Sequence, residues 1–186
     1  MPSRAELFNK KASSPRSNPD GVIMALALGQ GKNIADIGSG GGYFAFRFAD
    51  AVGPSGKVYA IDTDPEFLEY IEKEAVEKGC HNITTVRSQD DSFELPEDCI
   101  DLFFMRNVSH HLKNRSEYFG KLKARLRQGG RVAIIEYKPG GRFSFRRMHG
   151  HYVAKEELIG EMKGAGYRLL QDLDLLPEQS FTIFGR

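Results

Sequence analysis

The chain has 186 residues, and its 26 Lys and Arg against 25 Asp and Glu give a formal net charge of +1. This length suits one compact α/β domain, and the balanced charge argues against a nucleic-acid or anionic-membrane partner. The longest apolar run, Val22 to Leu28, is much shorter than the about 20 residues that cross a bilayer. We therefore expect no membrane span, and the polar start of the chain shows no targeting segment.

The two cysteines, Cys80 and Cys99, have the spacing of neither a disulfide framework nor a metal site. Reduced thiols are the simpler interpretation, and they indicate a cytoplasmic protein. Residues 1–18 mix Ser, Pro, Asn and basic side chains without periodicity, which is typical of a flexible arm. Such an arm is either a disordered tail or a segment that closes over a ligand. A single domain is expected over residues 19–186, beginning with a helix capped by Asn18.

Beyond that helix, extended and helical patterns alternate, which is typical of βαβ units and a mainly parallel sheet. Several extended segments are almost entirely apolar, as expected for strands buried on both faces. The expected strands are Asn33 to Ile37, Lys57 to Ile61, Asn82 to Arg87, Ile100 to Met105 and Arg131 to Tyr137. Two more, Tyr167 to Leu175 and Ser180 to Phe184, are joined by a turn too short for a parallel crossover, which predicts a terminal antiparallel hairpin.

The strongest local motif is Asp36-Ile37-Gly38-Ser39-Gly40-Gly41-Gly42, where an apolar strand breaks into glycines and an amphipathic helix begins. Glycines permit a tight turn and let backbone N–H groups approach a ligand at the helix N-terminus. A dinucleotide-binding fingerprint would have glycine at position 43, where this chain has Tyr43. The motif therefore favours a nucleoside ligand without a tightly seated pyrophosphate.

Polar residues also follow the second and third predicted strands. Asp62 ends the second strand and lies 24 positions after Gly38, a spacing that sets a carboxylate beside the glycine loop to accept from ribose hydroxyls. Asp64 is expected to cap the next helix. The segment Ser88 to Phe93 follows the third strand, and it either contacts an adenine ring or is a solvated acidic loop.

Together these motifs resemble those of class I S-adenosylmethionine-dependent methyltransferases. The resemblance is carried by the glycine motif, Ala60-Ile61-Asp62, Leu95-Pro96 to Asp101 and Leu126 to Val132, and runs from about Asn18 to the C-terminus. It is strongest for the branch of menaquinone/ubiquinone-biosynthesis and arsenite methyltransferases. In that branch the fourth strand is likewise followed by a His-His-Leu segment, here His110-His111-Leu112.

This resemblance implies a Rossmann-like three-layer α/β sandwich with a seven-stranded sheet of order 3-2-1-4-5-7-6 and an antiparallel strand 7. It implies S-adenosyl-L-methionine as cofactor and S-adenosyl-L-homocysteine as product, bound at the C-terminal strand edges. The cofactor-binding residues that it implies are Asp36, Gly38, Ser39, Gly40, Gly42, Asp62, Thr63, Asp90, Asp91, Ser92 and Arg106.

Two segments are candidates for the acceptor site. His110 and His111 follow the fourth strand and are the expected catalytic residues if the acceptor needs a general base; the alternative is a structural role in packing. The segment Lys138 to Lys155, which includes Arg142, Arg146, Arg147, His149 and His151, has no acid. Its charge favours an anionic acceptor, or is simply solvated. His149-Gly150-His151 has no acidic or Cys partner nearby in sequence, so no metal site is expected.

The predicted function is methyl transfer to a small-molecule acceptor. Arsenic is disfavoured because neither Cys80 nor Cys99 lies in an acceptor loop. Amino methylation of adenine in nucleic acid is disfavoured because Arg106-Asn107-Val108-Ser109 lacks the Asn/Asp-Pro-Pro-aromatic motif. The alternatives are a catalytically inactive cofactor-binding or partner subunit with the same fold and, less favoured because of Tyr43, an NAD-dependent oxidoreductase.

Overall fold

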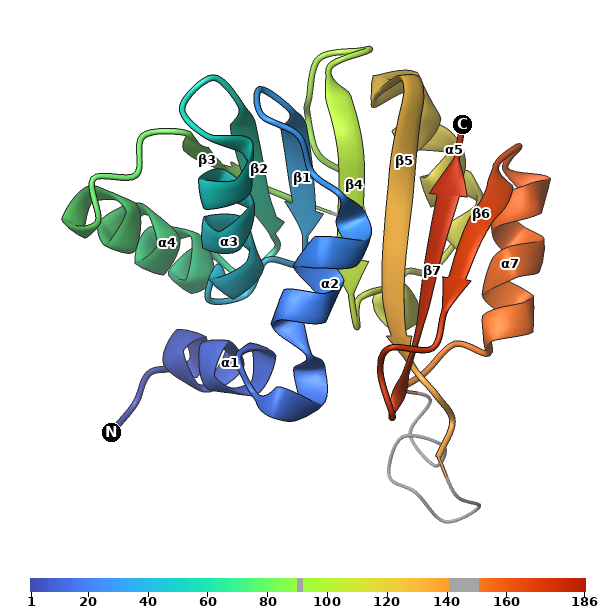
Figure 1. Cartoon of the computed structure of the whole chain (residues 1–186), viewed down its shortest axis with the longest axis horizontal. Helices are drawn as coiled ribbons and strands as arrows, with labels where there is room; N and C mark the ends of the chain where they lie inside the picture. Colours follow the sequence, from blue (N-terminus) through green and yellow to red (C-terminus); the bar gives the residue numbers. More distant parts are fainter. Residues whose placement is uncertain (90–91, 141–150) are drawn as a thin grey trace. The chain divides into compact units, whose positions relative to one another are not determined.

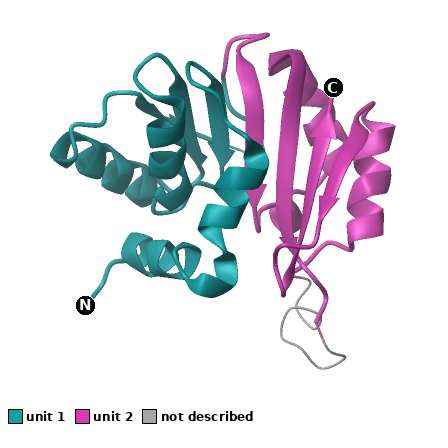
Figure 2. Ribbon diagram, in the orientation of Figure 1, with its two compact units in different colours: residues 1–94 teal, residues 95–186 magenta. Residues whose placement is uncertain are grey.

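The computed structural model describes residues 1–89, 92–140 and 151–186 (Figure 1). The chain forms two compact units, Met1–Glu94 and Leu95–Arg186 (Figure 2). The hydrogen-bonded order of its seven strands is β3-β2-β1-β4-β5-β7-β6, which confirms the Rossmann-like α/β fold and the predicted order. Among the described residues, no helix combines the length and the apolar character that crossing a membrane requires.

The first unit is built on three parallel strands, β1 (Asn33–Ile37), β2 (Lys57–Asp62) and β3 (Ile83–Arg87). Its helices are α1 (Arg4–Ala12), α2 (Pro19–Leu26), α3 (Tyr43–Val52) and α4 (Pro65–Glu77), with a 3₁₀ turn η1 (Pro15–Ser17). The two predicted helix N-caps are confirmed, since side-chain oxygens of Asn18 and Asp64 cap α2 and α4, respectively. The apolar stripe of α3, which includes Phe44, Phe48 and Val52, is buried.

The second unit contains β4 (Ile100–Arg106), β5 (Leu126–Tyr137), β6 (Arg168–Leu173) and β7 (Gln179–Gly185). Its described helices are η2 (Ser109–His111), α5 (Arg115–Arg125) and α7 (Lys155–Gly164). β4 and β5 are parallel, while β7 runs antiparallel to both β5 and β6. The predicted terminal hairpin is thus confirmed, and β7 is buried along its whole length.

Two local features differ from the sequence-based expectation. β5 begins at Leu126 rather than at Arg131, and it includes Gly129, which has a φ of 76°. Its pairing with β4 shifts register between Ile100 and Leu102, as at a β-bulge. The predicted flexible arm contains α1, which starts with a capping box in which Ser3 and Glu6 satisfy each other's backbone N–H groups. The mobility of this segment stays a prediction.

Candidate functional site

The glycine motif forms a tight loop at the C-terminal end of β1. Gly38, Gly40 and Gly42 have φ values of 71°, 52° and 82°, a region that L side chains rarely adopt. The backbone N–H groups of Gly38 and Ser39 both donate to the carbonyl oxygen of Ile61, at 2.8 and 3.1 Å, so the loop is anchored to β2. Gly42 serves as the N-cap of α3, whose N-terminus therefore faces the loop.

Asp62 lies at the end of β2 and is linked directly to this loop. Its Oδ2 accepts from the backbone N–H of Gly40 at 2.8 Å, and its Oδ1 accepts from the backbone N–H of Asp64 at 3.0 Å. A carboxylate has about four acceptor positions, so these two bonds leave each oxygen able to accept another donor. The predicted pairing of a glycine loop with a strand-end acid is thus present in the first unit.

Helix α1 packs on the glycine loop, an arrangement that was not predicted from the sequence. The Asn9 amide donates to the Gly41 carbonyl oxygen at 2.8 Å, and its Oδ1 accepts from the backbone N–H of Tyr43 at 3.1 Å. The ring of Phe8 packs edge-on against Phe67 with centroids 5.3 Å apart. The Ser3 to Glu6 capping box was the one sequence signal that could have revealed this helix.

The same loop contains a buried hydroxyl and two positions where the backbone is closely packed. The Ser39 hydroxyl is buried, and among the described residues it has no hydrogen-bond partner. A buried polar atom of this kind needs a partner from outside the protein or costs free energy. A Cβ at Gly41 would collide with the Ala5 carbonyl oxygen, and one at Gly42 would come within 2.7 Å of Ile71. The loop therefore requires glycine at both positions.

The remaining predicted cofactor residues have varied surroundings. Asp36 is buried at 3% exposure near the end of β1, and Thr63 is exposed after β2. Ser92 is exposed and forms an isolated bridge with Gln89, while its carbonyl oxygen accepts from the Ser88 hydroxyl at 3.1 Å. Asp90 and Asp91 lie outside the described residues. Arg106 ends β4 in the second unit, with its Cα in register with Ile135.

In the second unit, a turn after β4 positions the predicted histidines. Asn107 adopts a φ of 57°, and its N–H donates to the Ile135 carbonyl oxygen at 2.8 Å. Its side-chain oxygen accepts from Gln179 Nε2 at 2.7 Å, which ties the turn to β7. The chain then forms η2, in which Ser109 is fully buried and its hydroxyl has no partner in the described part of the chain. His110 and His111 follow directly.

Glu136, near the end of β5, holds His110 in place. The Glu136 side chain is 0% exposed, and its Oε1 lies 2.9 Å from His110 Nδ1. The carboxylate also accepts from the backbone N–H groups of His110, at 3.3 Å, and Tyr137, at 2.8 Å. A carboxylate oxygen is an acceptor, so the neutral form of His110 that fits this contact has its proton on Nδ1 and its lone pair on Nε2. Glu136 was not predicted, since a lone acid within an apolar strand has no distinctive spacing.

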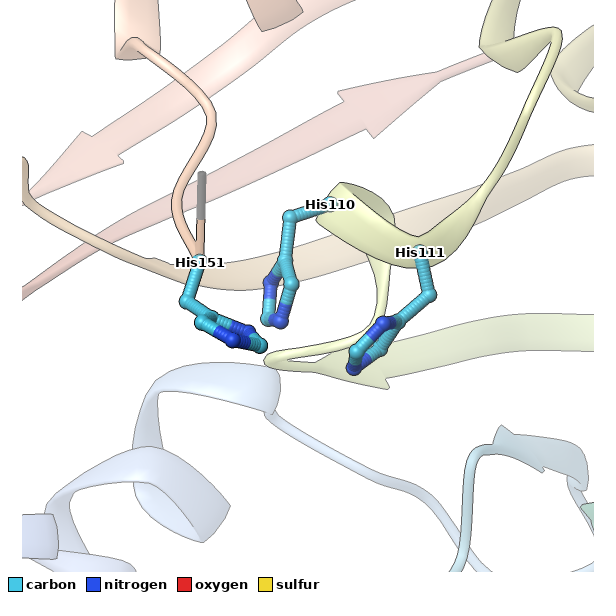
Figure 3. Close-up of side chains that lie close together, drawn as sticks. All are labelled: His110, His111 and His151. Atoms are coloured by element: carbon cyan, nitrogen blue, oxygen red, sulfur yellow. The ribbon is translucent and has the colours of Figure 1, made fainter. Parts of the chain in front are cut away.

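His111 and His151 lie beside His110 (Figure 3). The ring centroid of His110 is 4.1 Å from that of His111 and 5.5 Å from that of His151. Partial desolvation, together with the neighbouring His110 and His151 rings, lowers the pKa of His111 from its ordinary value of 6.5, although the residue as a whole is exposed. His151 comes from the predicted basic segment just before α7, so two separate sequence candidates meet in one place.

The described ends of that basic segment are neutralised by acids. Lys155 Nζ is 2.7 Å from Asp172 Oδ2, and Lys138 Nζ is 3.5 Å from Asp174 Oδ1. Both lysines also line a hollow of about 290 Å³ near β6 and β7. The other basic residues of the segment, Arg142, Arg146, Arg147 and His149, lie outside the described residues. The preference for an anionic acceptor therefore remains a prediction.

Comparisons with known proteins agree with this fold. The chain is 30% identical over 121 residues to a ubiquinone/menaquinone biosynthesis C-methyltransferase of Francisella tularensis subsp. novicida, covering 62% of this chain and 47% of that protein. It is 28% identical over 168 residues to the protein of the same name from Pseudomonas putida, covering 85% and 64%. The chain thus spans about half to two thirds of the length of these relatives.

A solved structure and a family model extend these similarities. The crystal structure of a SAM-dependent methyltransferase from Aquifex aeolicus superposes with a TM-score of 0.85 at 23% identity, covering 100% of this chain and 99% of that one. At this identity the likeness concerns the fold alone. The family model described as "Methyltransferase domain" matches residues 28–169, which is well over half of the chain. The chain therefore belongs to the methyltransferase-domain family.

Proposed function

We propose that the protein transfers a methyl group from S-adenosyl-L-methionine to a small-molecule acceptor. The observation that carries this proposal is the bond between the Gly40 N–H and Asp62 Oδ2 at 2.8 Å. It joins a glycine loop to a strand-end carboxylate that can still accept from ribose hydroxyls. Gly38, Ser39, Gly40, Gly42 and Asp62 would hold the nucleoside and methionine portions.

The other cofactor residues proposed are Asp36, Thr63, Asp90, Asp91, Ser92 and Arg106, by their match to the family's motifs. The buried Ser39 hydroxyl supports a polar ligand at the loop, because such a ligand would give it a partner. The nicotinamide alternative is opposed by Asn9 as well as by Tyr43. Asn9 Oδ1 accepts from the Tyr43 N–H at the N-terminus of α3, the kind of position where a dinucleotide seats its pyrophosphate.

The bound cofactor supplies an electrophilic sulfonium methyl, so the protein's main task is to align the acceptor and exclude water. For an acceptor that must lose a proton, we propose His110 as the general base. Glu136 fixes the proton of His110 on Nδ1, which leaves Nε2 as the accepting nitrogen. His111, the other predicted catalytic residue, would act beside it. The relatives named as C-methyltransferases of ubiquinone and menaquinone biosynthesis suggest a carbon atom of a quinone precursor as the first acceptor to test.

Isothermal titration with S-adenosyl-L-homocysteine tests the cofactor proposal. The wild-type chain should bind the compound, and Asp62→Ala should bind at least tenfold more weakly because the ribose hydroxyls lose their acceptor. Asp50→Ala removes an exposed carboxylate on α3 and is the matched control, expected to bind as the wild type does. Absence of binding to the wild type, or equal affinity in Asp62→Ala, contradicts the proposal. Stronger binding of NADH than of the homocysteine compound would favour an oxidoreductase.

A second experiment separates an enzyme from a cofactor-binding subunit. The chain is incubated with methyl-labelled cofactor and pools of small acceptors, including phenols, quinone precursors and a cell extract. A labelled product that disappears in Asp62→Ala is expected for an enzyme. Binding of cofactor without labelled product in any pool would identify a partner subunit instead.

A further inference from the structure

Three histidines from two distant segments of the sequence converge in the second unit. His110 and His111 project from η2 and His151 from the segment before α7, and the three rings point toward one another with His110 in the middle (Figure 3). One ring nitrogen from each lies within 4.8 Å of the corresponding nitrogens of the other two. The three imidazoles thus surround a common point.

The buried carboxylate of Glu136 prepares one of these histidines to bind a ligand. Its bond to His110 Nδ1, at 2.9 Å, turns the ring so that the Nε2 lone pair faces away from the carboxylate. In metal sites, a ligating histidine commonly donates its other ring N–H to a carboxylate, which fixes the ring and raises the basicity of the ligating nitrogen. Glu136 itself is held by two backbone N–H groups, so this orientation is rigid.

The distances are compatible with a metal after a small adjustment. With zinc–nitrogen bonds of about 2.0–2.1 Å, tetrahedral ligand nitrogens lie about 3.3 Å apart. The histidine nitrogens, within 4.8 Å of one another, would need to approach by about 1.5 Å at most. His111 is exposed, so rotation of its side chain can supply part of this movement while His110 stays fixed.

The chemistry of the donors selects the class of ion. Imidazole nitrogens suit zinc, copper, iron and nickel, whereas calcium and magnesium prefer oxygen ligands. Three protein ligands leave one position of a tetrahedral site open, as in catalytic rather than structural zinc sites. We propose that His110, His111 and His151 bind one divalent transition-metal ion of the zinc type, with Glu136 as the positioning residue and one coordination position open to water or an oxygen ligand.

This site goes beyond the proposed methyl transfer and competes with one part of it. A metal on His110 Nε2 would occupy the lone pair that a general base needs, so the metal-bound and base roles exclude each other. No metal site was expected from the sequence, because His149-Gly150-His151 has no acidic or Cys partner nearby in the sequence. The fold supplies His110 and His111 as partners for His151 instead.

The test uses the full chain without a polyhistidine tag, stripped with a chelator and titrated calorimetrically with Zn²⁺. One ion should bind per chain. His111→Ala and His151→Ala should each abolish tight binding, and Glu136→Gln should weaken it by about 10- to 100-fold. His81→Ala removes an exposed histidine of the first unit and is the matched control, expected to bind like the wild type. Titration with Co²⁺ should give visible absorption bands of four-coordinate intensity in the wild type and not in His151→Ala.

Unchanged Zn²⁺ affinity in both His111→Ala and His151→Ala overturns the proposal, as does absence of binding to the wild type. Circular dichroism of each variant, together with its affinity for S-adenosyl-L-homocysteine, shows whether it is folded. The two proposals can fail separately. Zn²⁺ binding without homocysteine-compound binding supports the metal site and contradicts the cofactor proposal, and the reverse result supports the cofactor proposal and contradicts the metal site.

Discussion

Replacing Asn9 should release α1 from the glycine loop. Asn9→Ala removes two hydrogen bonds, from the Asn9 amide to the Gly41 carbonyl oxygen at 2.8 Å and from the Tyr43 N–H to Asn9 Oδ1 at 3.1 Å. Each contributes about 0.5–1.5 kcal/mol, so α1 should lose about 1–3 kcal/mol of docking free energy. The ion pair of Arg4 with Asp64 compensates little, because the Arg4 side chain is 62% exposed.

Amide hydrogen exchange read by mass spectrometry measures this loss directly. A change of about 1–3 kcal/mol corresponds to about 5- to 150-fold faster exchange in the α1 peptide, while peptides of β1 and α4 keep their rates. Asn9→Asp keeps the acceptor for the Tyr43 N–H but loses the donor to Gly41, so its α1 exchange should fall between Asn9→Ala and the wild type.

The matched control is Asn114→Ala, which removes the N-cap of α5 in the second unit and should leave α1 unchanged. Unaltered α1 exchange in Asn9→Ala would refute the reasoning. So would equal acceleration throughout the first unit, since it would mean that α1 opens only together with the whole unit.

Three further predictions concern stability and reactivity. Gly42 has a φ of 82°, so Gly42→Ala should lower the free energy of unfolding by roughly 1–3 kcal/mol. Gly120 lies in α5 with open space around the position that a Cβ would take, so Gly120→Ala should raise the free energy of unfolding by about 0.5–1 kcal/mol. Denaturant titration that gives the opposite order would contradict both predictions. Burial raises the pKa of the Tyr167 hydroxyl in the folded chain. The contribution of Tyr167 to folding stability is therefore complete below the unfolded pKa of about 10 and is lost as the pH rises above that value. The free energy of unfolding should fall more between about pH 8 and pH 11 in the wild type than in Tyr167→Phe, and an equal fall in both would contradict this prediction. Burial also raises the pKa of the Cys80 and Cys99 thiols, so both should react more slowly with a disulfide reagent at neutral pH in the folded chain than in denaturant; equal rates would exclude the effect.

The sheet was predictable because its signals are local. The apolar runs of β1 and β4, the cap at Asp64 and the short turn before β7 each identify their element from a few neighbouring residues. The early start of β5 was not predicted, because Gly129 and Gly130 read as a break. In the structure, Leu126 already pairs with Ile100 of β4, and the register shifts before Arg131 pairs with Leu102. Pairing between strands overrides local propensity at such positions.

The candidate site was predictable where its residues follow strand ends. The places of Gly38 and Asp62 could be predicted from the strand ends and from their spacing. Those of Asn9 and Glu136 could not, because Asn9 contacts Gly41, 32 residues away, and Glu136 contacts His110, 26 residues away. The meeting of His151 with His110 is likewise a product of the fold, since neither residue type nor spacing links positions 41 residues apart. Long-range contacts of this kind leave no periodic signal in the sequence.

The hydrogen bonds of Glu136 matter for attempts to change what the protein acts on. Because the same carboxylate accepts from the backbone and the ring of His110, one side chain of β5 sets both where η2 lies and how that ring is turned. A mutant library that varies position 136 would therefore disturb loop placement and ring orientation together. Variation at the exposed His111, with Glu136 kept, alters the loop surface while its support stays intact, and should yield the larger share of folded variants.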